Sequence, residues 1–336
     1  MPRSLRIEYP GAVYHVLCRG DQREPIFQND ADRELFLKTL GQACAKTGWR
    51  GHAFVLMPNH YHLLLETPEP NLVAGMRWFQ STYTRRYNDR HKLCGHLFQG
   101  RYKALLIDGS EPAYFRTVSD YIHLNPARAR LLRPEAPDLR SFGWSSFPVY
   151  AGRAKGPRWL QTARVLGSHG LSEDARGRRD YATYMGERMA EVWSKDPHLQ
   201  AREWREIRRG WYLGDEGFKE RLLERLAGVV SGRKRESYTG AAAQAHDERM
   251  AAQLLQRGLA ALGLSLAEVQ TLRQKDDRKQ GLAWLLRSAT VASSDWVSTQ
   301  LTMGHRSNVS RAVRKIAEAR TAMAIRVRHL MQLCKD

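Results

Sequence analysis

The sequence predicts an α+β protein in which a ferredoxin-like β-α-β-β-α-β domain precedes an all-α region that contains a helix-turn-helix. Two observations predict this class. Strand and helix patterns alternate in the ferredoxin-like order over the first part of the chain. After about residue 152 the strand patterns disappear, and the remaining segments have the periodicity and composition of helices.

The first strand, helix and hairpin follow from local patterns. Residues 11–18 (GAVYHVLC) mix β-branched and aromatic residues, which favours a strand. Residues 29–48 open with Asn and Asp, which cap helices, and close on a glycine suited to a helix terminus. The apolar runs on either side of Pro58-Asn59, a turn-forming pair, predict a β-hairpin.

A second helix, a fourth strand and a third helix complete this part of the chain. They are predicted over residues 71–92, 95–108 and 110–124, and Pro126 stops the last helix. A ferredoxin-like unit carries its first two helices on one sheet face, which leaves the other face for a ligand or an additional helix.

Three regions are therefore expected. Residues 1–152 form the ferredoxin-like domain, residues 153–232 a helical connecting region and residues 245–336 a second helical domain. A charged segment rich in Gly, Ala and Ser separates the last two regions and predicts a linker.

The composition points to a polyanionic partner. The 336 residues include 54 Lys+Arg against 35 Asp+Glu, a net charge of +19, so nucleic acid is the first candidate and a generally basic soluble protein the alternative. Neither a signal peptide nor a run of roughly 18 apolar residues is recognisable, which predicts a cytoplasmic protein without a membrane partner. No CxxC pair occurs among the four cysteines, so neither a disulfide framework nor a zinc ribbon is expected.

Two histidines stand in the apolar run "FVLMPNHYHLLLETP". On a strand, His60 and His62 point to the same face and could share a divalent cation, provided that further ligands are present. Histidines that merely line a half-buried strand are an alternative. A zinc hydrolase of the HxHxDH kind would need Asp where Leu64 stands, and a cupin would need a mostly β chain.

A second constellation is "SDYIHLNP". Tyr121 and Asn125 are four residues apart and share one helix face, whereas His123 points elsewhere. Tyr121 could be a nucleophile and Asn125 an oxygen ligand to the same metal. Packing in the core or at an interface is the competing interpretation.

Four blocks taken together carry a family resemblance: "RIEYPGAVYHVLCRGDQREPIF", "MPNHYHLLLETP", "GHLFQGRYKALLI" and "YIHLNPARA". In this order, over roughly residues 1–150, they resemble the IS200-type tyrosine transposases, and more closely their single-copy relatives associated with repetitive extragenic palindromes (REP). The resemblance implies that His60-Tyr61-His62 is the HUH motif and Tyr121 the nucleophile. Asn125 would complete the metal site, where mobile IS200-type enzymes commonly carry Gln.

The resemblance also implies an activity. His60, His62 and Asn125 would hold Mg²⁺ or Mn²⁺, and Tyr121 would attack the scissile phosphate to form a 5′-phosphotyrosine. The enzyme would thus cleave and rejoin single-stranded DNA beside a palindromic hairpin. Mobile relatives supply the tyrosine in trans across a dimer and single-copy relatives need not, so monomer and homodimer both stay open.

Other residues of the first region have secondary roles. Tyr83 and Tyr87 are rival nucleophiles, but their position on the helix after the hairpin favours packing roles. Basic residues are expected to contact phosphates: Arg85, Arg86, Lys92, Arg101 and Lys103.

The carboxy-terminal sequence predicts a helix-turn-helix that binds duplex DNA. A short helix starts near Trp296, a turn lies around Gly304 and a basic helix starts near Ser307. The segment resembles the DNA-binding region of the replication initiator DnaA, and a helical bundle with a basic face is the alternative. The residues at the position where recognition helices meet bases are Arg306, Ser307, Asn308 and Arg311.

Three functions remain in competition. The first is the metal-dependent single-strand DNA transesterase, and the second a non-catalytic regulator that binds hairpin or duplex DNA. The third is an unrelated metallohydrolase, although the sequence lacks its acidic ligands. The complete set of His60, His62, Tyr121 and Asn125 favours the first.

Overall fold

The computed structural model describes residues 3–133, 135, 137–194, 204, 205, 207, 210–231 and 238–335. Two compact units are present. The larger contains Arg6–Leu222, and the smaller contains Leu223–Asp336 together with Met1–Leu5.

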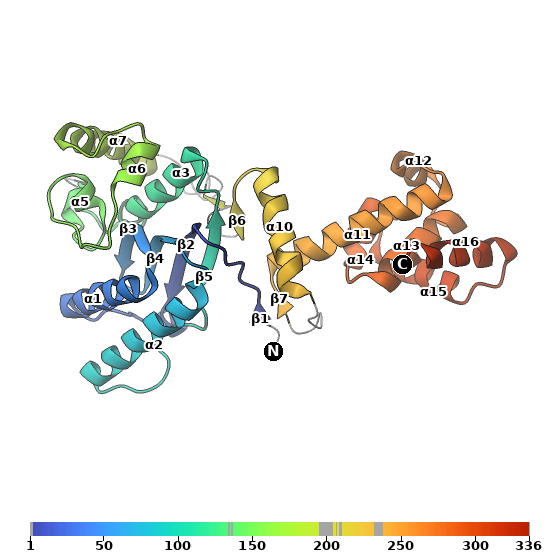
Figure 1. Cartoon of the computed structure of the whole chain (residues 1–336), viewed down its shortest axis with the longest axis horizontal. Helices are drawn as coiled ribbons and strands as arrows, with labels where there is room; N and C mark the ends of the chain where they lie inside the picture. The colour runs from blue at the N-terminus through green and yellow to red at the C-terminus, as the bar shows by residue number, and fades with distance from the viewer. Residues whose placement is uncertain are drawn as a thin grey trace. The chain divides into compact units, whose positions relative to one another are not determined.

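The larger unit is built on a five-stranded sheet (Figure 1). Its spatial order is β3-β4-β2-β5-β6. The first four of these pair antiparallel, in the arrangement of a ferredoxin-like unit, and β6 adds a parallel edge strand beside β5. The predicted α+β class and strand order are confirmed. The strands are β2 (Ala12–Arg19), β3 (Arg50–Met57), β4 (His60–Thr67), β5 (Lys103–Ile107) and β6 (Tyr212–Leu213).

Two helices cover one face of the sheet. They are α1 (Asp30–Thr47) and α2 (Leu72–His91), which pack against each other. The ring of Tyr61 on β4 contacts Phe36 of α1 and Phe79 of α2. Asn29 caps α1 through a capping box with Asp32, as its Asn/Asp-rich start predicts.

The opposite face is covered by α3 (Pro112–His123) (Figure 1). Because side chains alternate along a strand, His60, His62 and Leu64 of β4 point to the side away from Tyr61. Leu64 lies in one buried cluster with Phe115 of α3. The two histidines and the third helix are therefore on the same side of the sheet.

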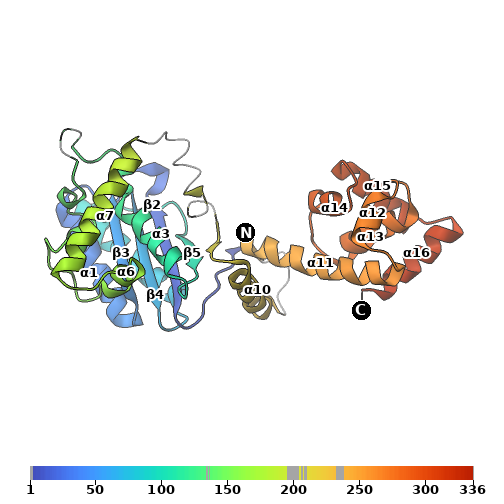
Figure 2. The same ribbon diagram turned by 90° about the horizontal axis from the view of Figure 1, so that it is seen from above.

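Helices that follow α3 extend this layer, and α6 packs beside α3 (Figure 2). Phe147, Val165, Tyr181 and Met185 belong to the same buried cluster as the sheet residues. The larger unit therefore continues to Leu222, past the boundary predicted at residue 152. The other helices with described bounds that begin in this unit are η1 (Asp21–Arg23), α4 (Asn125–Arg128), η2 (Leu139–Ser141), α5 (Phe147–Tyr150), α6 (Ala163–Ser168), α7 (Ala175–Ser194) and α10 (Glu216–Val230).

The smaller unit is mainly helical, in agreement with the prediction for the carboxy-terminal region. A short parallel pair joins β1 (Arg3–Ser4) to β7 (Tyr238–Thr239). Its core includes Leu255, Leu286 and Val309. The helices of this unit after β7 are α11 (Ala241–Leu262), α12 (Leu266–Thr271), α13 (Asp277–Ala289), α14 (Ser294–Gln300), α15 (Arg306–Ala317) and α16 (Ala322–Leu333).

The short helix, the turn and the basic helix predicted near the carboxy terminus are present as α14, a turn at Gly304 with φ of 78°, and α15. The predicted linker falls partly on residues 232–237, which lie outside the described residues. None of the helices described here has the length and apolar character that crossing a membrane requires.

Candidate active site

A cavity of about 520 Å³ lies where β2 ends, β4 and β5 begin and α4 starts. All four residues predicted to carry the chemistry line it: His60, His62, Tyr121 and Asn125. Arg101 and Lys103, predicted to contact phosphates, line it as well. The cavity therefore brings together residues from three strands and two successive helices.

A hydrogen-bond chain orients His60. Asn59 donates its Nδ2 to the carbonyl oxygen of Arg23 at 2.9 Å, which leaves its Oδ1 facing Nδ1 of His60 at 2.8 Å. Because Oδ1 can only accept, His60 carries its proton on Nδ1. The lone pair of His60 is then on Nε2. The backbone of Arg23, with φ of 67°, anchors the chain from a left-handed conformation.

A buried histidine orients His62. Nε2 of His15, on β2, is 2.9 Å from Nδ1 of His62, and the two rings stack with centroids 5.1 Å apart. His15 is completely buried, and within the described structure its Nδ1 has no hydrogen-bond partner. Since the bond engages Nδ1 of His62, Nε2 is the atom that His62 can offer to a ligand.

Burial keeps these imidazoles neutral. Desolvation lowers the pKa of His15 to about 3 and, together with the charge of Arg19, lowers the pKa of His60 to about 4. Desolvation, with smaller contributions from the neighbouring histidines and arginines, lowers the pKa of His62 well below its usual range. Neutral imidazole is the form that binds a metal.

Tyr121 and Asn125 come from the end of α3 and the start of α4. The Tyr121 ring meets His62 and His15 edge-on, with centroids 5.5 and 5.6 Å apart. Nδ2 of Asn125 donates to the backbone oxygen of Tyr121 at 3.1 Å, which makes Oδ1 the atom that can ligate a cation. The helical spacing of four residues places both side chains at one cavity.

The donor set fits a divalent cation. Two neutral imidazole nitrogens and one amide oxygen suit Mn²⁺, or Mg²⁺ with additional water ligands. Across the described residues, no group of three or more His, Cys, Asp and Glu side chains could hold a metal. The site predicted from the sequence is of a different kind, because its third protein ligand is an amide.

Two further basic side chains, which the sequence analysis did not assign to the site, line the cavity. Arg19 and Arg128 line it beside Arg101 and Lys103, and no carboxylate is among the lining residues that the structure describes. Arg128 follows Tyr121 and Asn125 at positions i+7 and i+3, so helical spacing could have identified it. A lining with four basic side chains is suited to an anion such as a phosphodiester.

The rival tyrosines lie on the other face of the sheet. Tyr83 is fully buried and donates its hydroxyl to the backbone oxygen of Ile26 at 2.7 Å. Burial raises its pKa well above the usual range, with a smaller contribution from the charge of Asp32. Tyr87 packs against Tyr83 and is 3% exposed. Both therefore have the packing positions expected of them.

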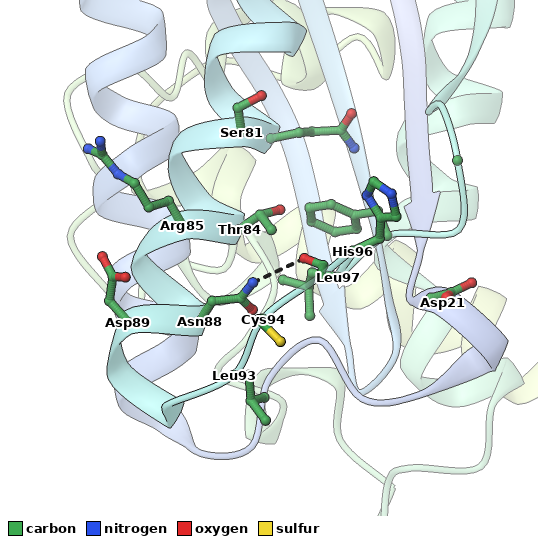
Figure 3. A pocket seen from close by; sticks show the side chains of 14 residues that line it. Asp21, Ser81, Thr84, Arg85, Asn88, Asp89, Leu93, Cys94, His96 and Leu97 are labelled. Carbon is green, nitrogen blue, oxygen red and sulfur yellow. Dashed lines mark hydrogen bonds between the residues drawn. The ribbon is translucent and has the colours of Figure 1, made fainter.

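Arg85 and Arg86 on α2 do not line the cavity of the histidines. Arg86 donates to Thr39 and Gln42 on α1, at 2.8 Å each. Arg85 is exposed beside a separate hollow of about 810 Å³ (Figure 3). In that hollow Asn88 donates to the backbone oxygen of Gly95 at 3.1 Å. Lys92, also exposed, ends α2 in a left-handed conformation.

In the carboxy-terminal unit, the four predicted DNA-binding residues lie at the start of α15. Arg306 and Arg311 are exposed. Ser307 is half-buried and accepts from Arg311 at 3.3 Å. Asn308 donates to the backbone oxygen of Met303 at 2.7 Å and so stabilises the turn. The two arginines are thus the side chains most accessible to a ligand.

Comparison with known proteins supports the resemblance over part of the chain. Residues 9–125 match the family model of the IS200-like transposases. A solved structure described as the REP-associated tyrosine transposase bound to a REP hairpin is similar at 16% identity and a TM-score of 0.38. The match covers 48% of this chain and 92% of that one. No curated protein matches. The segment from strand β2 to Asn125, which contains all four predicted site residues, is therefore IS200-transposase-like.

Proposed function

We propose that this protein is a metal-dependent single-strand DNA transesterase, with Tyr121 as its nucleophile. One observation carries the proposal. A phenol, two neutral imidazoles and an amide line the same cavity as four basic side chains, and the described lining includes no carboxylate. This arrangement suits the attack of an oxygen on a phosphodiester, whose charge must be neutralised before a nucleophile can approach.

The family resemblance supplies the reaction that we propose for these side chains. The phenolic oxygen of Tyr121 attacks phosphorus, a P–O bond to tyrosine forms, and the bond from phosphorus to the 3′ oxygen breaks. The phenol proton passes to water, and the departing 3′ oxygen takes a proton from water. Because the phosphotyrosine retains the ester bond, a 3′-hydroxyl can reverse the step and rejoin a strand.

His60, His62 and Asn125 would hold the cation. Bound there, Mg²⁺ or Mn²⁺ supplies positive charge that polarises a non-bridging phosphate oxygen. The hydrogen bonds that His60 makes with Asn59, and His62 with His15, orient both imidazoles before the cation binds. The basic side chains bind the phosphates on either side of the scissile one.

The proposed substrate is a single strand that carries a palindromic hairpin. This follows from the family resemblance of the sequence. Cleavage in cis is proposed, because the rings of Tyr121 and His62 in one chain are in contact, with centroids 5.5 Å apart. A monomer therefore contains the whole set of reactive groups.

The test uses a labelled hairpin oligonucleotide and Mn²⁺. Wild-type protein should form a covalent adduct that survives denaturation, and Tyr121→Phe should form none while it binds the strand as before. Tyr83→Phe is the matched control, because its hydroxyl lies on the other sheet face, and it should form the adduct normally. An adduct that persists in Tyr121→Phe would place the nucleophile elsewhere. Tight, metal-independent binding without any adduct would instead support the regulator.

Binding of duplex DNA by the carboxy-terminal unit is a second part of the proposal. The exposed Arg306 and Arg311 at the start of α15 support it. In the full chain, changing both to Gln should weaken duplex binding and leave adduct formation on the hairpin strand unchanged. Equal duplex binding by this variant would favour the alternative of a helical bundle without a recognition role.

A further inference from the structure

Arg128 occupies a distinctive position at the cavity. It is the last residue of α4, and its guanidinium carbon lies 4.6 Å from the centre of the Tyr121 ring. The same carbon is also 5.8 Å from the centre of the Trp204 ring. Trp204 is 2% exposed, and its ring centre is 5.4 Å from that of Tyr121. The cation is thus held by two aromatic rings, one of which belongs to the proposed nucleophile.

Arg128 has no ion pair with any acidic residue that the structure describes. Its Nε is buried, and among the described residues that atom has no hydrogen-bond partner. The described residues that line its cavity include no carboxylate. A partly buried guanidinium carries a desolvation cost that a bound anion would offset.

The geometry relates this cation to the reacting groups. Arg128 shares the cavity with His60, His62 and Asn125, and its charge contributes to the lowered pKa of His62. An anion bound at the guanidinium would therefore lie among the proposed nucleophile and the proposed cation ligands. A planar guanidinium can stack on the tyrosine and still direct N–H groups at a phosphate oxygen, which an ammonium group cannot do.

We propose that Arg128 is a catalytic residue that contacts a non-bridging oxygen of the scissile phosphate, and that Trp204 is the positioning residue that holds it against Tyr121. The inference rests on the proposed transesterase function. Arg128 stays protonated throughout and transfers no proton. It stabilises the negative charge that the phosphoryl oxygens carry as the tyrosyl bond forms.

The inference gives the segment after the family match a role in the reaction. Arg128 and Trp204 both lie beyond residue 125, where that match ends. Trp204 belongs to the region predicted as a connecting segment, yet it reaches the nucleophile. On this inference, a residue beyond the family match contributes to the site through its contact with the Tyr121 ring.

The test measures the rate of adduct formation by full-length variants on the hairpin strand. Arg128→Gln should slow it by roughly 10²–10³-fold, as expected on removal of a group that stabilises a charged transition state. Arg128→Lys keeps the charge but loses the stacked fork and should recover part of this loss. Trp204→Leu should give a smaller loss of about 10-fold, since it removes only support.

Arg130→Gln is the matched control. Arg130 also stacks on a tryptophan, Trp193, at 4.8 Å, but it is exposed and does not line the cavity. Its rate should stay at the wild-type value. Circular dichroism and a hairpin-binding measurement on each variant distinguish a loss of reaction rate caused by misfolding from one caused by the missing side chain.

A substrate modification separates a direct contact from a structural role. A methylphosphonate at the scissile linkage replaces one non-bridging oxygen by a methyl group. If Arg128 contacts that oxygen, one diastereomer should slow the wild type much more than it slows Arg128→Gln. Equal slowing of both proteins by both diastereomers, or a normal rate for Arg128→Gln, would overturn the inference and leave the transesterase intact. Failure of the wild type to form any adduct would overturn both.

Discussion

Replacing His15 with Phe should weaken Mn²⁺ binding without removing any ligand of the cation. His15 is completely buried, and the only side-chain hydrogen bond that the described structure gives it joins its Nε2 to Nδ1 of His62, at 2.9 Å. Phenylalanine fills a similar volume but offers no nitrogen. His62 would then keep its place on β4, while its Nδ1 would have no partner and its ring orientation would no longer be fixed.

The size of the effect follows from that single bond. Loss of an outer hydrogen bond to a ligating histidine typically lowers metal affinity by about 10–100-fold. This corresponds to about 1.4–2.7 kcal/mol of binding free energy. The free energy of unfolding should fall as well, by about 1–3 kcal/mol, because a buried ring nitrogen is left unsatisfied.

The assay is a calorimetric titration of the DNA-free protein with Mn²⁺, beside a urea unfolding curve. His52→Phe is the matched control. His52 is 1% exposed, and its Nε2 donates to the carboxylate of Glu66, its single side-chain partner, at 3.2 Å. Its Nδ1 faces the backbone oxygen of Gln161 at 3.3 Å, and the ring does not line the cavity. It should lose stability and keep its Mn²⁺ affinity. An unchanged affinity in His15→Phe would refute the positioning role, and absence of Mn²⁺ binding by the wild type would refute the cation site itself.

Three further predictions concern acid stability, salt and assembly. The hydrogen bond from His52, and the nearby arginine charges, lower the pKa of Glu66 to about 2 from an ordinary 4.5, despite opposing desolvation. The ionised Glu66 therefore stabilises the fold fully above pH 4.5, and this stabilisation is lost as the pH falls toward 2. Glu66→Gln should lower the free energy of unfolding at neutral pH by about 1–2 kcal/mol after solvent screening. Unfolding curves of this variant should also depend less on pH in the acid range. Arg101→Gln should reduce the slope of log affinity against log salt for the single strand by about 0.7, and an unchanged slope would exclude a phosphate contact. A mixture of Tyr121→Phe and His62→Ala proteins should form no adduct, because the cis arrangement leaves each chain incomplete, and restored adduct would show a trans site.

The parts of the fold that could be predicted are those written in local patterns. The capping box at Asn29, the Pro58-Asn59 turn and the alternation along β4 act over a few residues, so the sequence displays them directly. The short edge strand β6 was not predicted, because a two-residue strand has no periodicity and exists only through its pairing with β5.

The residues of the site that could be predicted are likewise those related by a local pattern. His60 and His62 share a face through strand alternation, and Tyr121 and Asn125 through helical spacing. His15 was not predicted, because β2 pairs with β4, its neighbour in space and not in sequence. In this register His15 lies opposite Leu64 and therefore diagonally beside His62. Trp204 reaches the Tyr121 ring through packing of a later segment, for which the sequence carries no marker.

The continuous buried cluster of the larger unit determines where the boundaries of an expressed fragment should be placed. A fragment that stops where the family match stops would expose the apolar surface that Phe147, Tyr181 and Met185 now cover, and it would be prone to aggregation. The shortest expression fragment should therefore span Arg6–Leu222. Shorter fragments that prove inert would say nothing about the chemistry of the intact chain.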